Sequence, residues 1–171
     1  NPGNLFYEKI DTQNIGIAGY SQGGVGAVRA VTECENSGLY KAIFTGSVAH
    51  SYLAQMWGGY DASNVSIPWF MTAATGTSDD TGATDAATAW LGVAPLSSLV
   101  ENYNAMPDSV FKLRARVVGA EHAEIQMKTG GYMTAWMLYQ LQGDEEAGKA
   151  LTGENAEILH NANWQDIEKN R

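Results

Sequence analysis

The sequence predicts an α/β fold in which about four parallel strands are flanked by helices. Two observations lead to this prediction. Short apolar runs at residues 15–19, 41–46, 67–74 and 111–119 alternate with segments of helical composition, and this alternation favours a parallel sheet with right-handed crossovers. The chain has 171 residues and a hydrophobic fraction of 44%, which is typical of a globular domain with a buried core.

The first three apolar runs have the composition of strands. Residues 15–19 are wholly apolar, as expected for a central strand of a parallel sheet. Residues 41–46 follow the turn signal Asn36-Ser37-Gly38. Residues 67–74 carry Pro68 near their start, where a strand tolerates the missing amide. We therefore expect three strands before residue 75.

The fourth run, residues 111–119, alternates apolar and basic side chains. Its basic residues are Lys112, Arg114 and Arg116. This alternation is typical of a strand with one wetter face, and charged side chains protect an exposed edge against pairing with another chain. The pattern predicts an edge strand.

Five segments are predicted to be helical: residues 24–33, 85–90, 96–105, 131–141 and 145–151. Asp144 is expected to cap the last of them, because an aspartate at this position accepts hydrogen bonds from free helix amides. The polar tail, residues 154–171, is expected to be anchored by Trp164. One helix should pack on the sheet through a stripe of large apolar side chains, namely Met133, Trp136, Met137 and Leu141.

Charge and composition exclude some classes of protein. The formal net charge is -9 and the basic residues are scattered, so no basic patch is present to bind nucleic acid. Cys34 is the one cysteine and cannot form an internal disulfide; its helical context predicts a buried thiol. The sequence contains no segment with the composition of a signal peptide or membrane span.

The pentapeptide Gly19-Tyr20-Ser21-Gln22-Gly23 stands between the first strand and the first helix. A G-x-S-x-G sequence in this setting lifts a serine hydroxyl onto a strained turn above a parallel sheet. We expect the two glycines to remove collisions at that turn. Ser21 is therefore the candidate nucleophile, and the backbone amide of Gln22 is the candidate donor to an oxyanion.

A nucleophilic serine requires a base, which in hydrolases of this type follows the last strand of the set. His122 meets this requirement, since it comes directly after residues 111–119. His160 lies in the polar tail and is expected at the surface. His50 follows the second strand and precedes the acid in sequence, which suits a wall of a substrate pocket better than the base.

The acid is expected in the loop after the third strand, because the chain order in such hydrolases is serine, acid, histidine. This loop contains Asp79 and Asp80, which are adjacent and so point in different directions. Asp80 is the preferred candidate and Asp79 the alternative; Asp85 lies further away. The histidines are far apart in sequence and have no cysteine cluster beside them, so no metal site is predicted.

Residues 10–24, with the Ser21 turn, resemble the nucleophile region of α/β-hydrolases in the branch of dienelactone hydrolases, chlorophyllase-like enzymes and cutinases or polyester hydrolases. Residues 67–81 and 117–122 are similar in layout to the acid and histidine loops of that branch. The resemblance implies a cofactor-free serine esterase with Ser21, His122 and either Asp80 or Asp79 as its triad. It also implies a small-molecule or polymeric ester as substrate, and it favours a secreted or cell-surface location.

Tyr20 and His50 are further candidates for contact with the substrate. Residues 15–19 are apolar like a central strand, but the segment before them is too short to cover their other side. We therefore expect residues 1–171 to be the carboxy-terminal half of a single α/β-hydrolase domain, with an amino-terminal portion that carries further strands and the second oxyanion donor as its partner. A peptidase, an acyltransferase or a non-catalytic binding module on the same scaffold remain as alternatives.

Overall fold

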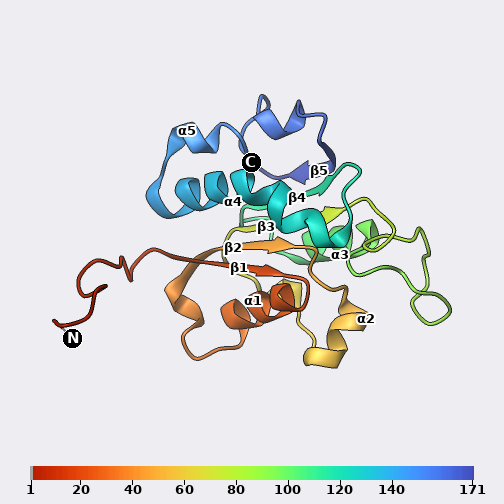
Figure 1. The fold of residues 1–171 in the computed structure, drawn as a ribbon, viewed down its shortest axis with the longest axis horizontal. Helices are drawn as coiled ribbons and strands as arrows, with labels where there is room; N and C mark the ends of the chain where they lie inside the picture. Colours follow the sequence, from red (N-terminus) through yellow and green to blue (C-terminus); the bar gives the residue numbers. More distant parts are fainter. Residues whose placement is uncertain (1) are drawn as a thin grey trace.

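A computed structural model describes residues 2–171, which form one five-stranded sheet with helices on both faces (Figure 1). The strand order is β1-β2-β3-β4-β5. The first four strands run parallel and the fifth runs antiparallel to β4. The strands are β1 (Ile15–Tyr20), β2 (Tyr40–Gly46), β3 (Trp69–Ala74), β4 (Lys112–Val117) and β5 (Trp164–Lys169). The predicted four parallel strands are confirmed, with one strand added.

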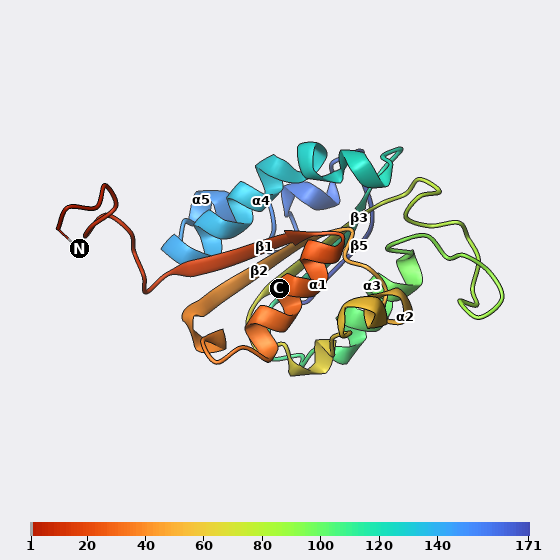
Figure 2. The same ribbon diagram turned by 60° about the horizontal axis from the view of Figure 1, so that its bottom comes forward.

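The helices lie in two layers. Figure 2 shows α4 and α5 on one side of the sheet and α1, α2 and α3 on the other. Their bounds are α1 (Gln22–Thr32), α2 (Ser51–Ala54), α3 (Leu96–Ala105), α4 (Ile125–Gln142) and α5 (Glu145–Gly148). The prediction for α3 is confirmed at both ends, whereas α4 begins six residues earlier than the predicted 131–141. Asp144 caps α5 as predicted, since its carboxylate accepts the amides of Glu146 and Ala147.

Both faces of β3 are covered, so all six of its residues are buried. Trp69 and Met71 pack in the cluster under α1 and α3, while Phe70 packs in the cluster under α4. This alternation follows from the two-residue period of a strand. Trp136 of α4 is fully buried and its indole donates to the carbonyl of Ile43 over 3.1 Å. The predicted packing of the α4 stripe on the sheet is thus confirmed.

The prediction that the fourth strand is an edge strand is wrong. β5 pairs with β4 along its outer side, and the basic residues of β4 find partners inside the protein. Lys112 is 3% exposed, and its ammonium group donates to the carbonyl of Met106 over 2.9 Å. Arg114 and Arg116 pair with acidic residues of β5. Arg114 and Arg116 therefore bind the strand whose pairing they were expected to prevent.

β5 escaped prediction because it contains an irregularity. Between Arg114 and Arg116 of β4 the register shifts, so that β5 carries one more residue than its partner. Asp166 occupies this bulge with φ of 53°. As a result, Trp164 and Ile167 both pack against the same core cluster, although they are three residues apart. A bulge breaks the two-residue alternation by which a strand is identified from sequence. The predicted anchoring role of Trp164 is confirmed, since this residue is buried.

Two other local predictions are wrong. Residues 85–90 form a single turn, because Asp85 uses its carboxylate to accept the amide of Ala87 and the hydroxyl of Thr88. Such local side-chain bonds compete with helix continuation. Cys34 is exposed and lies beyond the last residue of α1, Thr32. Its thiol is therefore at the surface rather than in a buried helix.

β1 lies at one end of the sheet and has β2 as its one neighbour within residues 2–171. Figure 1 shows the segment before β1 extending away from the sheet and its helices. Most of β1 is half-buried, and Ala18 is exposed. The expectation that β1 is central in a larger sheet stays a prediction. Across the described chain, no helix combines the length and apolar character needed to cross a bilayer.

Candidate active site

Ser21 occupies a sharp turn between β1 and α1 at the carboxyl end of the parallel strands. Its backbone has φ of 55° and ψ of -124°, a region that costs a non-glycine residue conformational energy. Its amide donates to the carbonyl of Gly46 at the end of β2 over 2.9 Å. This bond ties the strained turn to the neighbouring strand.

The two glycines around Ser21 are not equivalent. A Cβ on Gly19 would lie 2.2 Å from the carbonyl oxygen of Gly23, whereas a Cβ on Gly23 would meet nothing within 4 Å. The expectation that both glycines relieve a collision therefore holds only for Gly19. Its missing side chain lets the start of α1 lie directly against the end of β1.

Ser21, His122 and Asp79 form a continuous chain of polar contacts. His122 Nε2 lies 3.0 Å from Ser21 Oγ, and His122 Nδ1 lies 2.6 Å from Asp79 Oδ1. Because Nδ1 faces a carboxylate, it carries the ring proton and leaves Nε2 as an acceptor for the serine proton. These contacts join the loops that follow β1, β3 and β4. The arrangement has the geometry of a nucleophile, base and acid set.

Asp79 is fully buried, and its second carboxylate oxygen is also occupied. Asp79 Oδ2 accepts the hydroxyl of Ser47 over 2.5 Å and the amide of Ala74 over 2.7 Å. These two donors fix the carboxylate so that Oδ1 faces His122. Ser47 was missed by the sequence analysis, although its place after β2 at the same sheet edge is a usable signal. Its backbone is also left-handed, with φ of 46°.

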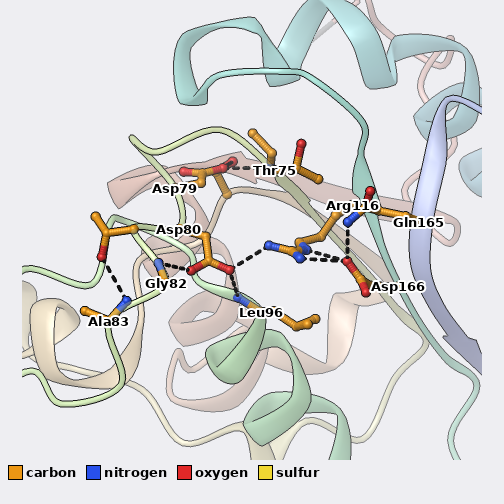
Figure 3. A network of polar contacts seen from close by, with 12 residues as sticks. Thr75, Asp79, Asp80, Gly82, Ala83, Leu96, Arg116, Gln165 and Asp166 are labelled. Atoms are coloured by element: carbon orange, nitrogen blue, oxygen red, sulfur yellow. Dashed lines mark hydrogen bonds and ion pairs between the residues drawn. The ribbon is translucent and has the colours of Figure 1, made fainter.

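Asp80, the preferred acid in the sequence analysis, does not contact His122. Its Oδ2 accepts Nη1 of Arg116 over 2.7 Å and the amide of Leu96 over 3.2 Å. Figure 3 shows Asp79 and Asp80 pointing to different sides of the loop, with Asp80 directed at Arg116. The structure therefore brings the alternative, Asp79, to the histidine. The Asp85 carboxylate takes part in the local turn described above.

The loop that holds Asp79 (the acid loop, residues 75–82) is bound directly to the loop that holds His122. The amide and hydroxyl of Ser78 both donate to the carboxylate of Glu121, and Ser78 Oγ accepts the amide of His122. The hydrogen bonds from Ser78 hold the pKa of Glu121 below its usual range. A side chain at position 76 would collide with Glu121, because an ideal Cβ on Gly76 would lie 2.3 Å from the carboxylate carbon of Glu121.

Tyr20 supports His122 from β1. Its hydroxyl donates to the carbonyl of His122 over 3.0 Å, and the two ring centroids are 4.8 Å apart. Burial raises the pKa of the Tyr20 hydroxyl, with a smaller contribution from the Asp79 charge. The phenol therefore stays protonated and remains a donor. The predicted contact of Tyr20 with substrate stays a prediction.

His50 is 5% exposed and lines a cavity of about 400 Å³ together with Tyr52 and Trp90. Its Nδ1 accepts the amide of Leu53 over 3.4 Å, while its buried Nε2 has no partner within the described chain. Burial lowers the pKa of the His50 ring, so the neutral form is favoured. The predicted place of His50 as a cavity wall fits this geometry, and its contact with substrate stays a prediction. His160 is exposed, as predicted.

Gln22 is the first residue of α1. The first amides of a helix have no carbonyl one turn earlier to accept them and are free to bind an anion. This position supports the prediction for the Gln22 amide. Within residues 2–171, no group of three or more His, Cys, Asp or Glu side chains is placed to hold a metal ion.

The mixed α/β sheet of this chain matches part of the α/β-hydrolase fold in solved structures. One is a Mycobacterium tuberculosis puromycin-hydrolyzing peptidase (15% identity, TM-score 0.55, covering 80% of this chain and 23% of that chain). Another is a Pyrococcus horikoshii acylaminoacyl peptidase (16%, TM-score 0.53, 85% and 27%). A third is an acylaminoacyl peptidase in complex with Z-Gly-Gly-Phe-chloromethyl ketone (17%, TM-score 0.52, 78% and 25%). The chain thus spans about a quarter of each. No family model and no curated protein matches it.

Proposed function

We propose that this protein is a serine hydrolase that cleaves carboxylic esters through a triad of Ser21, His122 and Asp79. The observation that carries this proposal is the chain of contacts of 3.0 Å and 2.6 Å from the serine through the histidine to a buried carboxylate. The serine, the histidine and the carboxylate come from separate loops and contact one another in the order that acyl transfer requires. The strained backbone of Ser21 supports the same role.

In the proposed reaction, Ser21 Oγ attacks the ester carbonyl while His122 Nε2 accepts the serine proton. The tetrahedral intermediate then expels the alcohol, which takes that proton from His122, and an acyl-enzyme ester on Ser21 remains. A water molecule loses a proton to His122 and attacks this ester, and Ser21 regains the proton as the acid leaves. Asp79 keeps its charge throughout and stabilises the imidazolium form of His122.

The Gln22 amide is the proposed donor to the oxyanion of the tetrahedral intermediate. Each such donor contributes about 100- to 1000-fold in kcat. We propose that the second donor comes from a segment that lies along the free side of β1, since Ser21 follows that strand directly. A further parallel strand there would give β1 the central place predicted from its sequence.

The test is hydrolysis of a chromogenic ester by the protein and its Ser21→Ala variant. Ser21→Ala should abolish turnover, while the matched control Ser109→Ala should retain it, because Ser109 is exposed and lies beside the opposite end of β4. Retained hydrolysis by Ser21→Ala would overturn the assignment of the nucleophile.

A second candidate function is peptide hydrolysis by the same triad. The solved structures named above are peptidases, whereas the resemblance of residues 10–24 to the dienelactone hydrolase and cutinase branch favours esters. A paired assay separates the two functions by comparing an acyl ester with an acyl-peptide anilide that has the same acyl group. For each substrate, kcat/KM is divided by the rate constant of uncatalysed hydrolysis. We expect this ratio to be larger for the ester, and a larger ratio for the anilide would favour a peptidase.

A further inference from the structure

Arg116 of β4 joins two carboxylates that are far apart in the sequence. Its Nη1 donates to Asp80 Oδ2 over 2.7 Å, and its Nε and Nη2 donate to Asp166 Oδ2 over 2.8 and 2.7 Å. The Arg116 side chain is 10% exposed. Figure 3 shows the three side chains in a row between the acid loop and β5. We name this row, Asp80-Arg116-Asp166, the ion-pair clamp.

The clamp holds the acid loop at the residue next to Asp79. Besides Arg116, Asp80 binds the amides of Gly82 and Leu96, over 3.0 and 3.2 Å. The carbonyl of Asp79 accepts the amide of Ala94 over 3.1 Å. Because the two aspartates share a peptide bond, a shift of the Asp80 carboxylate would move Asp79 relative to His122.

The other end of the clamp is built at a conformational cost. Asp166 has φ of 53° and sits in the bulge of β5. A left-handed backbone costs a non-glycine residue conformational energy, although aspartate tolerates it better than most. The bulge also re-aims a side chain, and here the Asp166 carboxylate faces Arg116. The strained residue is therefore tied to the clamp by its own ion pair.

Resting on the proposed function, we propose that Arg116 is a positioning residue, which sets the distance between Asp79 and His122 by clamping the acid loop to β5. A buried ion pair gives little net stability, because desolvation offsets its Coulombic attraction. A role in positioning the acid loop therefore explains the clamp better than a contribution to stability does. A displacement of about 1 Å at a catalytic group can cost on the order of 100-fold in rate.

The test compares Arg116→Gln with Arg114→Gln. Arg114 is a matched control, because it lies two residues away on the same strand, is 13% exposed, and binds the Glu168 carboxylate and the backbone carbonyl of Asp166 on β5 but neither the Asp166 carboxylate nor the acid loop. We expect Arg116→Gln to lower kcat for the ester about 10- to 100-fold with little change in KM, and Arg114→Gln to change kcat less than about twofold. Equal effects of the two variants would overturn the proposal.

Arg116→Gln leaves two partly buried carboxylates without their cation and can fail to fold for that reason. The triple variant Asp80→Asn, Arg116→Gln, Asp166→Asn removes this imbalance of charge. We expect it to recover the melting temperature but not kcat. Recovery of both would show that the clamp acts on stability alone and would contradict a positioning role.

A readout that does not depend on turnover separates this proposal from the proposed function. We expect the proton between His122 Nδ1 and Asp79 Oδ1 to give a far-downfield proton NMR resonance, which Asp79→Asn should remove. We expect this resonance to be unchanged in Arg114→Gln and shifted or broadened in Arg116→Gln. An unchanged resonance in a folded Arg116→Gln variant would overturn the positioning role. Absence of ester turnover in the unmodified protein would instead overturn the proposed function.

Discussion

Gly19 and Gly23 lie so close together that a Cβ on Gly19 would stand 2.2 Å from the carbonyl oxygen of Gly23. The contact is between backbone atoms and cannot be relieved by a rotamer change. It fixes how near α1 approaches β1 and thus the strained turn at Ser21 between them. The two glycines of the pentapeptide therefore give a direct test of the turn.

Gly19→Ala should destabilise the protein by about 1–3 kcal/mol, because the added methyl group overpacks a site with no free space. Gly23→Ala should leave the free energy of unfolding unchanged or raise it by up to about 1 kcal/mol, since its Cβ would enter open space in a helix. Urea unfolding of both variants checks this. Similar losses in the two would contradict the geometry of the turn.

Asp79→Asn and Asp80→Asn should differ strongly in activity. Loss of the Asp79 charge should lower kcat by on the order of 10⁴-fold, as expected when the histidine loses the carboxylate that orients it. Asp80→Asn acts through the clamp and should cost about 10-fold. Steady-state ester hydrolysis measures both variants. A larger loss for Asp80→Asn would return the role of the acid to that residue.

Tyr20→Phe removes the hydroxyl that donates to the carbonyl of His122 and keeps the ring that packs on the imidazole. We expect a loss of about 1 kcal/mol in the free energy of unfolding and a fall in kcat, since one restraint on the histidine loop is gone. Tyr7→Phe is the control, because Tyr7 lies in the exposed segment before β1. A Tyr20→Phe variant that matches this control in both measurements would remove the supporting role from Tyr20.

His50 should make stability depend on pH on the acid side. Burial lowers the pKa of the folded His50 ring, so as the pH falls below about 6.5 the unfolded chain binds a proton that the folded chain resists. The stability that this ring contributes is present above that pH and is lost as the pH falls through the folded pKa. His50→Asn removes the titrating group but keeps a side chain able to cap α2.

Urea midpoints at about pH 7.5 and about pH 5 measure this effect. The drop between the two pH values should be smaller for His50→Asn than for the unmodified protein. An equal drop would show that other groups account for the acid sensitivity. His160→Asn provides the comparison, because His160 is exposed.

The sequence was sufficient to predict the parallel strands and to place Ser21 and His122 at one edge of the sheet. Apolar runs, the glycines of the turn and the chain order of the groups all depend on local pattern. The preference for Asp80 over Asp79 was wrong, because the direction of the Asp80 side chain depends on its ion pair with Arg116. That arginine lies 36 residues from Asp80 in sequence and binds it across the sheet.

The other wrong predictions also arose from partners that are distant in sequence or from local competition. Arg116 and Lys112 look like the charges of an exposed edge, yet each is buried against an acceptor. β5 is obscured by the bulge at Asp166, and the turn after Asp85 is formed by that residue's own carboxylate. Ser47 carries no motif; its place after β2 is its one sequence signal, and the hydrogen bond from its hydroxyl to Asp79 shows its role in the structure.

The central claim is that His122 and Asp79 activate Ser21 as a nucleophile, and covalent labelling by a fluorophosphonate probe tests it most directly. Mass spectrometry of the labelled protein should find the adduct on the peptide that contains Ser21. The adduct should be absent in Ser21→Ala and should form much more slowly in Asp79→Asn. A protein that is folded yet unlabelled at Ser21, or labelled equally in the Ser21→Ala variant, would contradict the claim and would favour a non-catalytic module on this scaffold.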